Sequence, residues 1–138
     1  DGSLPNVSTN NIEQLSDKWM KQYCDIHDTD TYWTAKRIVS VLDKFRVLLV
    51  VKDGQVLGYL DVQNCYDTNE IFALYIKPEA SSQGYELSLL TKAIELNKPN
   101  QMMVVVDVDN KEEVELYTAA GFVKLEGQNS VTAYIKET

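Results

Sequence analysis

The sequence predicts a mixed α/β fold: a mostly antiparallel sheet with a central parallel strand pair and flanking helices. The dipeptide Asp53-Gly54 lies between two apolar segments, which is the strongest short signal of a β-hairpin. Residues 70–108 read as strand, helix and strand, and such a unit brings its two strands together in parallel under a right-handed crossover. Two further apolar segments, 122–125 and 131–135, predict a final hairpin.

The first third of the chain predicts two helices. Apolar residues recur at helical spacing over residues 12–26, and a polar run follows them. A second helix is expected over residues 31–44, with Trp33 and Ile38 on its apolar face.

Proline and glycine mark the ends of the elements that follow. Pro78 ends a strand because it cannot continue a ladder, and Pro99 ends a helix. Gly121 is expected just after a helix, where glycine enters the left-handed region without strain. The expected order is strands at 47–51, 56–62 and 70–77, a helix at 84–97, a strand at 102–108 and a helix at 110–120.

Length and charge exclude several kinds of protein. The 138 residues predict one domain, residues 1–138, of which 1–8 are expected to be flexible or foreign to it. The net charge is −8 and no Lys/Arg cluster is visible, so neither a nucleic acid nor a membrane surface is expected as a partner. The acidic surface either attracts a cationic substrate such as an amine or only keeps the protein in solution.

The cysteines and the single histidine predict no metal site. Cys24 and Cys65 are far apart, and His27 stands alone, so no metal-ligand spacing exists. Two lone cysteines are typical of a reducing compartment, which favours the cytoplasm. Both are interpreted as small hydrophobic residues, and His27 as a polar residue at a helix end rather than a catalyst.

Two motifs carry a family resemblance. The first is the strand that begins at Glu70 and continues through Pro78 into a loop with Gly84. The second runs from Asn110 through Leu116-Tyr117 to Gly121-Phe122. In order and spacing they resemble the GNAT (Gcn5-related N-acetyltransferase) superfamily over the last two-thirds of the chain. The resemblance implies a GNAT-like fold and direct transfer of an acetyl group from acetyl-CoA to a primary amine of a small molecule or a peptide.

The resemblance also implies where acetyl-CoA binds. A loop that enters a helix presents unpaired backbone N–H groups, and these groups with the helix dipole form an anion site. In the family such a site holds the pyrophosphate, and the strand before it offers backbone groups to the pantetheine arm. Asn110 is implied to contact the same arm, or it caps the following helix. The implied cofactor residues are Leu74, Tyr75, Ile76, Ser81, Ser82, Gln83, Gly84, Tyr85, Glu86 and Asn110.

Two loop positions depart from the family pattern. Ser81 stands where the family has Gln or Arg, and Glu86 stands where it has Gly or Ala. A carboxylate about 6 Å from a phosphate would oppose binding by about 3 kcal/mol. Glu86 in the first helical turn can instead satisfy the helix dipole itself. The alternative function is therefore a non-catalytic GNAT-fold interaction or regulatory domain, paired with a second GNAT domain of a longer chain or with a second copy.

Acetyl transfer to an amine needs a base for the ammonium and an acid for the leaving thiolate. By resemblance the acid is Tyr117, whose phenol keeps its proton at neutral pH. The base is Glu70, acting directly or through water, with Asp61 and Asp107 as weaker candidates. Tyr117 can equally be an ordinary core tyrosine, and Glu70 a solvated carboxylate at a strand end.

The aromatic residues of the early helices are expected to pack in the core. Trp19, Tyr32 and Trp33 are the residues concerned. The resemblance offers an alternative, an aromatic pocket over the acceptor site.

Overall fold

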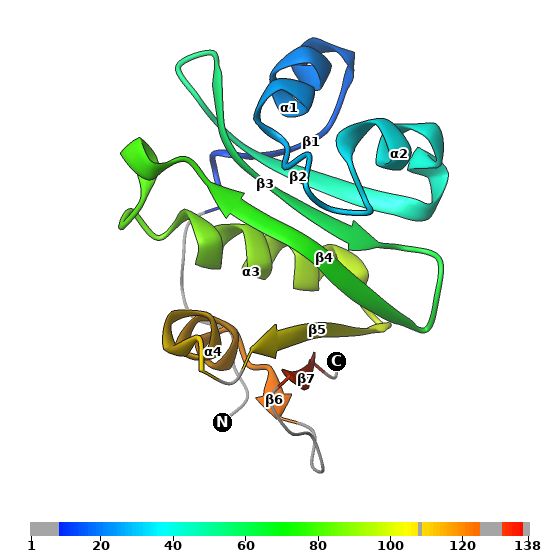
Figure 1. The fold of residues 1–138 in the computed structure, drawn as a ribbon, viewed down its shortest axis with the longest axis vertical. Coiled ribbons are helices and arrows are strands. Elements are labelled where there is room, and N and C mark those ends of the chain that lie inside the picture. The colour runs from blue at the N-terminus through cyan, green and yellow to red at the C-terminus, as the bar shows by residue number, and fades with distance from the viewer. Residues whose placement is uncertain (1–8, 108, 125–130, 137–138) are drawn as a thin grey trace.

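The computed structural model describes residues 9–107, 109–124 and 131–136, which form one seven-stranded sheet with helices on both faces (Figure 1). The strand order is β1-β2-β3-β4-β5-β7-β6. The strands are β1 (Ile12–Gln14), β2 (Phe45–Lys52), β3 (Gln55–Gln63), β4 (Thr68–Ile76), β5 (Gln101–Asp107), β6 (Val123–Lys124) and β7 (Val131–Lys136). The α-helices are α1 (Met20–Ile26), α2 (Ala35–Ser40), α3 (Tyr85–Asn97) and α4 (Lys111–Ala119), and short 3₁₀ turns cover Asp17–Trp19, Leu42–Lys44 and Pro78–Ala80.

The predicted fold class is confirmed. β4 and β5 run parallel, with α3 as the connection between them, and the other strand pairs are antiparallel. The hairpin at Asp53-Gly54 joins β2 to β3, and both turn residues have positive φ angles, 53° and 77°. Two positive φ angles match the right-handed twist of the strands, which is why this dipeptide favours the turn.

Two apolar cores lie on opposite faces of the sheet. Successive residues of β2 alternate between them: Leu48 and Val50 face α3 and α4, whereas Val47 and Leu49 face α1 and α2. This alternation is the period of two expected for a strand that is buried on both faces. Figure 1 shows α1 and α2 near β2 and β3, with α3 crossing behind β4.

The first expected helix begins later than the apolar spacing predicts. Ile12 belongs to β1 and lies opposite Val50 of β2. β1 is thus a short antiparallel strand at the edge of the sheet, beside β2. The prediction of a helix from residue 12 is therefore wrong, and α1 begins only at Met20. From this strand Ile12 packs against the core on the α3 side of the sheet, which explains its apolar side chain without a helix.

The second expected helix is shorter than predicted. Thr34 is its N-cap, and its hydroxyl accepts a bond from the N–H of Arg37 at 3.3 Å. α2 ends at Ser40 because Val41, with φ −131° and ψ 41°, leaves the helical conformation. The chain before Thr34 is a connection rather than a helical turn, and it becomes important for the site.

Later boundaries agree closely with the sequence. Gly84 is the N-cap of α3, Asn110 caps α4 by accepting the Glu113 N–H at 3.2 Å, and Gly121 follows α4 with a φ of 98°. The final hairpin is present as β6 and β7, although its turn, like residues 1–8 and 108, lies outside the described residues.

Three packing predictions need correction. Cys24 and Cys65 are exposed free thiols, not buried small residues. Tyr32 is 67% exposed and packs under the Arg37 guanidinium instead of entering the core. Trp19 is buried as expected, and Trp33 packs against Phe45.

Candidate functional site

β4 and β5 separate halfway along their length. Their parallel pairing joins residues 68–71 to residues 101–104 and ends where Ile71 faces Val104. Beyond that point β4 continues along β3 as far as Ile76. The side of β4 that faces β5 therefore presents backbone groups to a gap in the sheet.

A β-bulge explains the separation. Val62 faces Ile71 while Asp61 faces Ala73, so Phe72 is an extra residue in β4. A bulge bends its strand and increases the local twist. The bend turns the second half of β4 away from β5.

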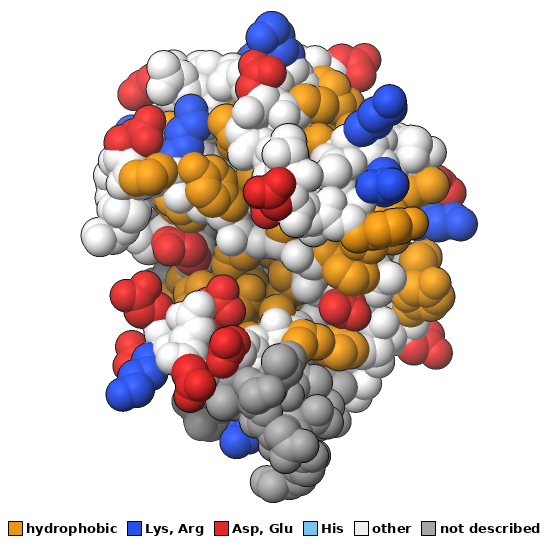
Figure 2. Space-filling model, viewed as in Figure 1, with side chains coloured by type: hydrophobic (Ala, Val, Ile, Leu, Met, Phe, Trp, Pro, Cys, Tyr) orange, Lys and Arg blue, Asp and Glu red, His pale blue; other side chains and the backbone are white. Residues whose placement is uncertain are grey.

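A cavity of about 900 Å³ occupies the gap. Its walls come from both faces of the sheet: β4, the start of α3 and α4 on one side, and the connection from α1 to α2 on the other. Figure 2 shows a hollow with an apolar floor and acidic side chains around it. A cavity that crosses the sheet can receive one ligand from each face.

Most of the sequence-predicted site residues meet at this cavity. Leu74, Tyr75, Ile76, Ser81, Gly84, Glu86, Asn110 and Tyr117 line it. Ser82, Gln83, Tyr85 and Glu70 are not among its lining residues. Tyr85 packs in the core beneath α3, and Glu70 is a half-buried residue on the paired half of β4.

The N-terminus of α3 opens into the cavity at Gly84. This residue has a φ of 79°, which strains any residue with a Cβ, and a Cβ added there would meet nothing within 4 Å. The N–H groups of the first turn have no partner within the helix. A 13-residue helix with free N–H groups above open space fits a phosphate group.

The charges around the cavity are acidic. Asp28, Glu86, Glu112 and Glu113 line it, and none of the described lining residues is Lys or Arg. Burial, and then the charge of Asp107, raises the pKa of Glu113. Backbone groups and apolar walls thus fit acetyl-CoA, whereas the carboxylates favour a cation at the same cavity.

Tyr117 lies buried at the cavity and keeps its phenol proton. Its ring is buried and packs edge-on against Phe122 at 5.4 Å between centroids. Burial, and then the charge of Glu113, raises the pKa of the Tyr117 phenol well above its ordinary value. The phenol therefore carries its proton at every physiological pH.

A comparison with family models decides the family. The model described as the acetyltransferase (GNAT) family matches residues 12–122. The chain belongs to the GNAT acetyltransferase family. The resemblance recognised in the sequence is confirmed, and acetyl transfer is the general activity that this family supports. No match was found among curated protein sequences.

Solved structures share the GNAT fold over nearly the whole chain. The PaiA N-acetyltransferase of Thermoplasma acidophilum, in complex with coenzyme A, is 18% identical, with a TM-score of 0.71 over 92% of this chain and 98% of its own. A GNAT acetyltransferase of Elizabethkingia anophelis with acetyl-CoA bound is 14% identical, with a TM-score of 0.71 over 94% and 99%. A spermidine N-acetyltransferase chimera from Vibrio cholerae is 16% identical, with a TM-score of 0.70 over 90% and 94%. Family and neighbours support acetyl-CoA as the cofactor, as the sequence predicts.

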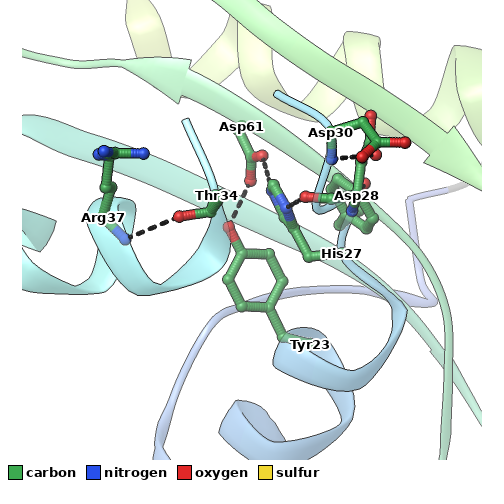
Figure 3. Close-up of polar contacts among 8 residues, drawn as sticks. Tyr23, His27, Asp28, Asp30, Thr34, Arg37 and Asp61 are labelled. Carbon is green, nitrogen blue, oxygen red and sulfur yellow. Dashed lines mark hydrogen bonds and ion pairs between the residues drawn. The ribbon is translucent and has the colours of Figure 1, made fainter. Parts of the chain in front are cut away.

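The GNAT domain also contains a buried polar cluster that the sequence did not reveal. Asp61 on β3 is fully buried, and its two carboxylate oxygens contact His27 Nε2 at 2.5 Å and the Tyr23 hydroxyl at 2.7 Å. Figure 3 shows Tyr23 and His27 converging on Asp61. His27 lies at the end of α1, as the sequence suggested, but it is buried against Asp61. Asp61, held by these two contacts, is not among the residues that line the cavity.

The pKa values of both members of the buried pair are raised, so the pair holds its protons to higher pH than the free groups do. His27 Nδ1 donates to the Asp28 carbonyl at 3.0 Å, so the second proton lies between Nε2 and Asp61. Burial opposes the charged imidazolium, but the hydrogen bond and charge of Asp61 outweigh burial and raise the pKa of His27. Burial also raises the pKa of the Asp61 carboxyl, against the opposing effect of His27.

In the described part of the chain, no group of three or more His, Cys, Asp or Glu could hold a metal ion. None of the helices found there combines the length and the apolar character needed to cross a bilayer.

Proposed function

We propose that this GNAT domain transfers an acetyl group from acetyl-CoA directly to a primary amine of a small molecule or a peptide. The observation that carries the proposal is the gap between β4 and β5, which leads to the free N-terminus of α3. Extended backbone groups lie along one wall of this cavity, and the first turn of α3, with its unpaired N–H groups, lies at its end. These are the two features that a ligand with an amide-containing arm and a pyrophosphate requires.

The cofactor residues are assigned from this arrangement. Backbone groups of residues 74–76 would pair with the pantetheine arm, and the first turn of α3 after Gly84 would hold the pyrophosphate. Asn110 lies at the cavity with its side chain already accepting the Glu113 N–H, so its amide nitrogen is the group left for the arm. When bound, acetyl-CoA supplies the acetyl group as an activated thioester.

Tyr117 is proposed as the acid. Tyr117 lines the cavity, and its phenol keeps its proton at neutral pH and would give that proton to a leaving thiolate.

Glu70 remains the proposed base, acting through water. It lies on β4, before the bulge, and burial raises the pKa of its carboxyl from the ordinary value, in the direction that suits a base at neutral pH. Since Glu70 does not line the cavity, a bridging water is needed to reach the amine.

The proposal is tested by measuring release of free coenzyme A thiol when the purified chain receives acetyl-CoA and a set of primary amines. The set includes butane-1,4-diamine and a short peptide with a free N-terminus. Amine-dependent thiol release that falls in the Tyr117→Phe variant supports the proposal. Release that is independent of every amine tested contradicts it.

A second function, a GNAT-fold interaction or regulatory domain without catalysis, is supported by the acidic cavity. Glu86 lies on the first turn of α3, where the phosphates would bind, with no Lys or Arg among the described lining residues to balance it. This function predicts that the chain binds neither coenzyme A nor acetyl-CoA. Pairing with a second GNAT domain or with a second copy of this chain stays a prediction. A measurement of molecular mass in solution tests pairing with a second copy.

A further inference from the structure

The segment that links α1 to α2 forms the cavity wall opposite α3 and α4. Asp28 and Thr31 line the cavity from this segment, together with Ile26 at the end of α1. The anion site belongs to the other face of the sheet, at Gly84. A second substrate that approaches from the α1 side therefore meets Asp28.

Asp28 is held by the buried cluster through both of its backbone polar groups. Its carbonyl oxygen accepts from His27 Nδ1 at 3.0 Å, and its N–H donates to the Tyr59 hydroxyl at 3.1 Å. The Tyr59 ring stacks on the His27 ring at 4.6 Å with only 19° between their planes. The His27 and Tyr59 side chains, which both hydrogen-bond to the Asp28 backbone, thus pack against each other.

The position of the His27 ring, and with it the hydrogen bond to the Asp28 carbonyl, depends on Asp61. Asp61 anchors His27 at Nε2 and is itself fixed by the Tyr23 hydroxyl (Figure 3). A buried ion pair contributes little net stability, because desolvation consumes most of the attraction, and apolar residues of similar size would pack as well. What the pair supplies that apolar residues would not is a donor aimed at the Asp28 carbonyl.

The Asp28 carboxylate is exposed and oriented. Its Oδ1 atom accepts the Asp30 N–H at 2.9 Å, which fixes the side chain beside the cavity. An amine acceptor in water at neutral pH is an ammonium ion. A fixed carboxylate at the entrance from the acceptor face is complementary to that ion.

We propose that His27 and Asp61 are positioning residues, which fix Asp28 at the edge of the cavity so that its carboxylate contacts the ammonium group of the acceptor. The inference rests on the proposed function, because it assigns the acceptor side of that same cavity. Asp28 is the residue that contacts substrate, and the buried pair acts only through it.

The first experiment measures acceptor binding without turnover. Amide chemical shifts of the labelled chain are followed by NMR during titration with butane-1,4-diamine and, separately, with the uncharged butane-1,4-diol. We expect the diamine to shift the amides of residues 28–31 in a saturable way and the diol to leave them unchanged. Equal shifts with both compounds would overturn the inference.

Two matched variants separate the effect of the Asp28 carboxylate on diamine binding from the effect of the protein's overall negative charge. Asp28→Asn should weaken diamine binding about tenfold, the loss expected when one charge-assisted contact is removed. Asp30→Asn removes the same charge from a neighbouring exposed residue that does not line the cavity, and it should change the affinity less than about twofold. Equal effects of the two variants would contradict a contact at Asp28.

The positioning role is tested by Asp61→Asn, which leaves the Asp28 carboxylate intact. Diamine binding should again weaken about tenfold, since the carboxylate is no longer held in place. An affinity equal to that of the unchanged protein would show that the buried pair does not position Asp28.

A pH titration of the unchanged protein tests the same role if Asp61→Asn does not fold. His27 is the only histidine in the chain, so its ring nitrogens report the protonation of the pair without overlap. The groups in contact with it are Asp61 and Tyr59 from β3, Tyr23 from α1 and its neighbour Asp28. Cys24 and Lys36 line a smaller pocket together with His27. Diamine affinity should fall as the imidazolium loses its proton, while the diamine itself stays charged. Affinity that is constant through this titration contradicts the inference.

The outcomes also separate this inference from the proposed function. Acetyl-CoA binding and transfer with no diamine-specific shift at residues 28–31 would reject the inference alone. Diamine binding at Asp28 without any acetyl transfer would reject the proposed function and leave the cation site in place.

Discussion

The imidazole of His27 and the carboxylate of Asp61 are in hydrogen-bond contact inside the protein, with Nε2 and Oδ2 2.5 Å apart and 34 residues between them in sequence. His27 is 5% exposed and Asp61 is fully buried. The contact joins the end of α1 to β3, beside the bulge that separates β4 from β5. One pair thus connects the packing of the α1-side core to the geometry of the cavity.

Breaking this pair should destabilise the fold strongly. Asp61→Asn leaves an uncompensated buried imidazole, and we expect the free energy of unfolding to fall by about 3–5 kcal/mol. Urea denaturation measures the loss. Asp25→Asn, which removes an exposed carboxylate from α1, is the control and should change stability by less than about 0.5 kcal/mol. A similarly small loss of stability in both variants would mean that His27 and Asp61 are not hydrogen-bonded in solution.

Stability should fall as pH rises above neutrality. The folded protein has raised pKa values at His27 and at Asp61, so it holds protons that the unfolded chain releases. The His27 contribution is complete below the unfolded value near 6.5 and is lost as pH passes through the higher folded value. Denaturation midpoints between about pH 5 and pH 9 measure this slope, which His27→Gln should flatten. A stability that increases over this interval would contradict the assignment.

Tyr117→Phe should slow acetyl transfer by about a hundredfold, the lower end of what a positioned general acid contributes. The affinity for acetyl-CoA should stay the same, because the phenol is proposed to act on the leaving thiolate and not on binding. Steady-state rates and direct binding measurements separate the two. Tyr66→Phe alters an exposed tyrosine elsewhere and serves as the control. Full activity of Tyr117→Phe would remove this residue from the mechanism.

Glu86→Gln should tighten acetyl-CoA binding, because it removes a negative charge from the first turn of α3 where the pyrophosphate is proposed to bind. The gain is up to about a hundredfold if the carboxylate lies about 6 Å from a phosphate. Glu95→Gln, on the far half of the same helix, is the charge-matched control. Equal affinities for the original protein and Glu86→Gln would show that Glu86 points away from the cofactor.

Much of this fold could be predicted because its signals are local. The turn at Asp53-Gly54, the stop at Pro78 and the left-handed Gly121 each act over a few residues. β1 could not be predicted, since three residues become a strand only through pairing with β2. Apolar spacing at Ile12 satisfied a helical pattern equally well, and tertiary pairing decided between the two.

The candidate site likewise contains one part with local sequence signals and one part that depends on tertiary contacts. The residues around Gly84 and Tyr117 were found because each belongs to a motif of consecutive residues. The cluster of Tyr23, His27 and Asp61 was missed because its members meet only after α1 packs on β3. A lone histidine and a single aspartate on an otherwise apolar strand carry no spacing signal, although the polar residue inside the segment 56–62 was a clue that it had a buried partner.

Calorimetric titration of the purified chain with acetyl-CoA tests the central claim most directly. The account predicts saturable binding of one acetyl-CoA per chain in the micromolar range, through the gap between β4 and β5 and the first turn of α3. It also predicts tighter binding by Glu86→Gln. No heat of binding at millimolar acetyl-CoA, for the original chain and for that variant alike, would contradict the acetyltransferase function and favour the non-catalytic domain.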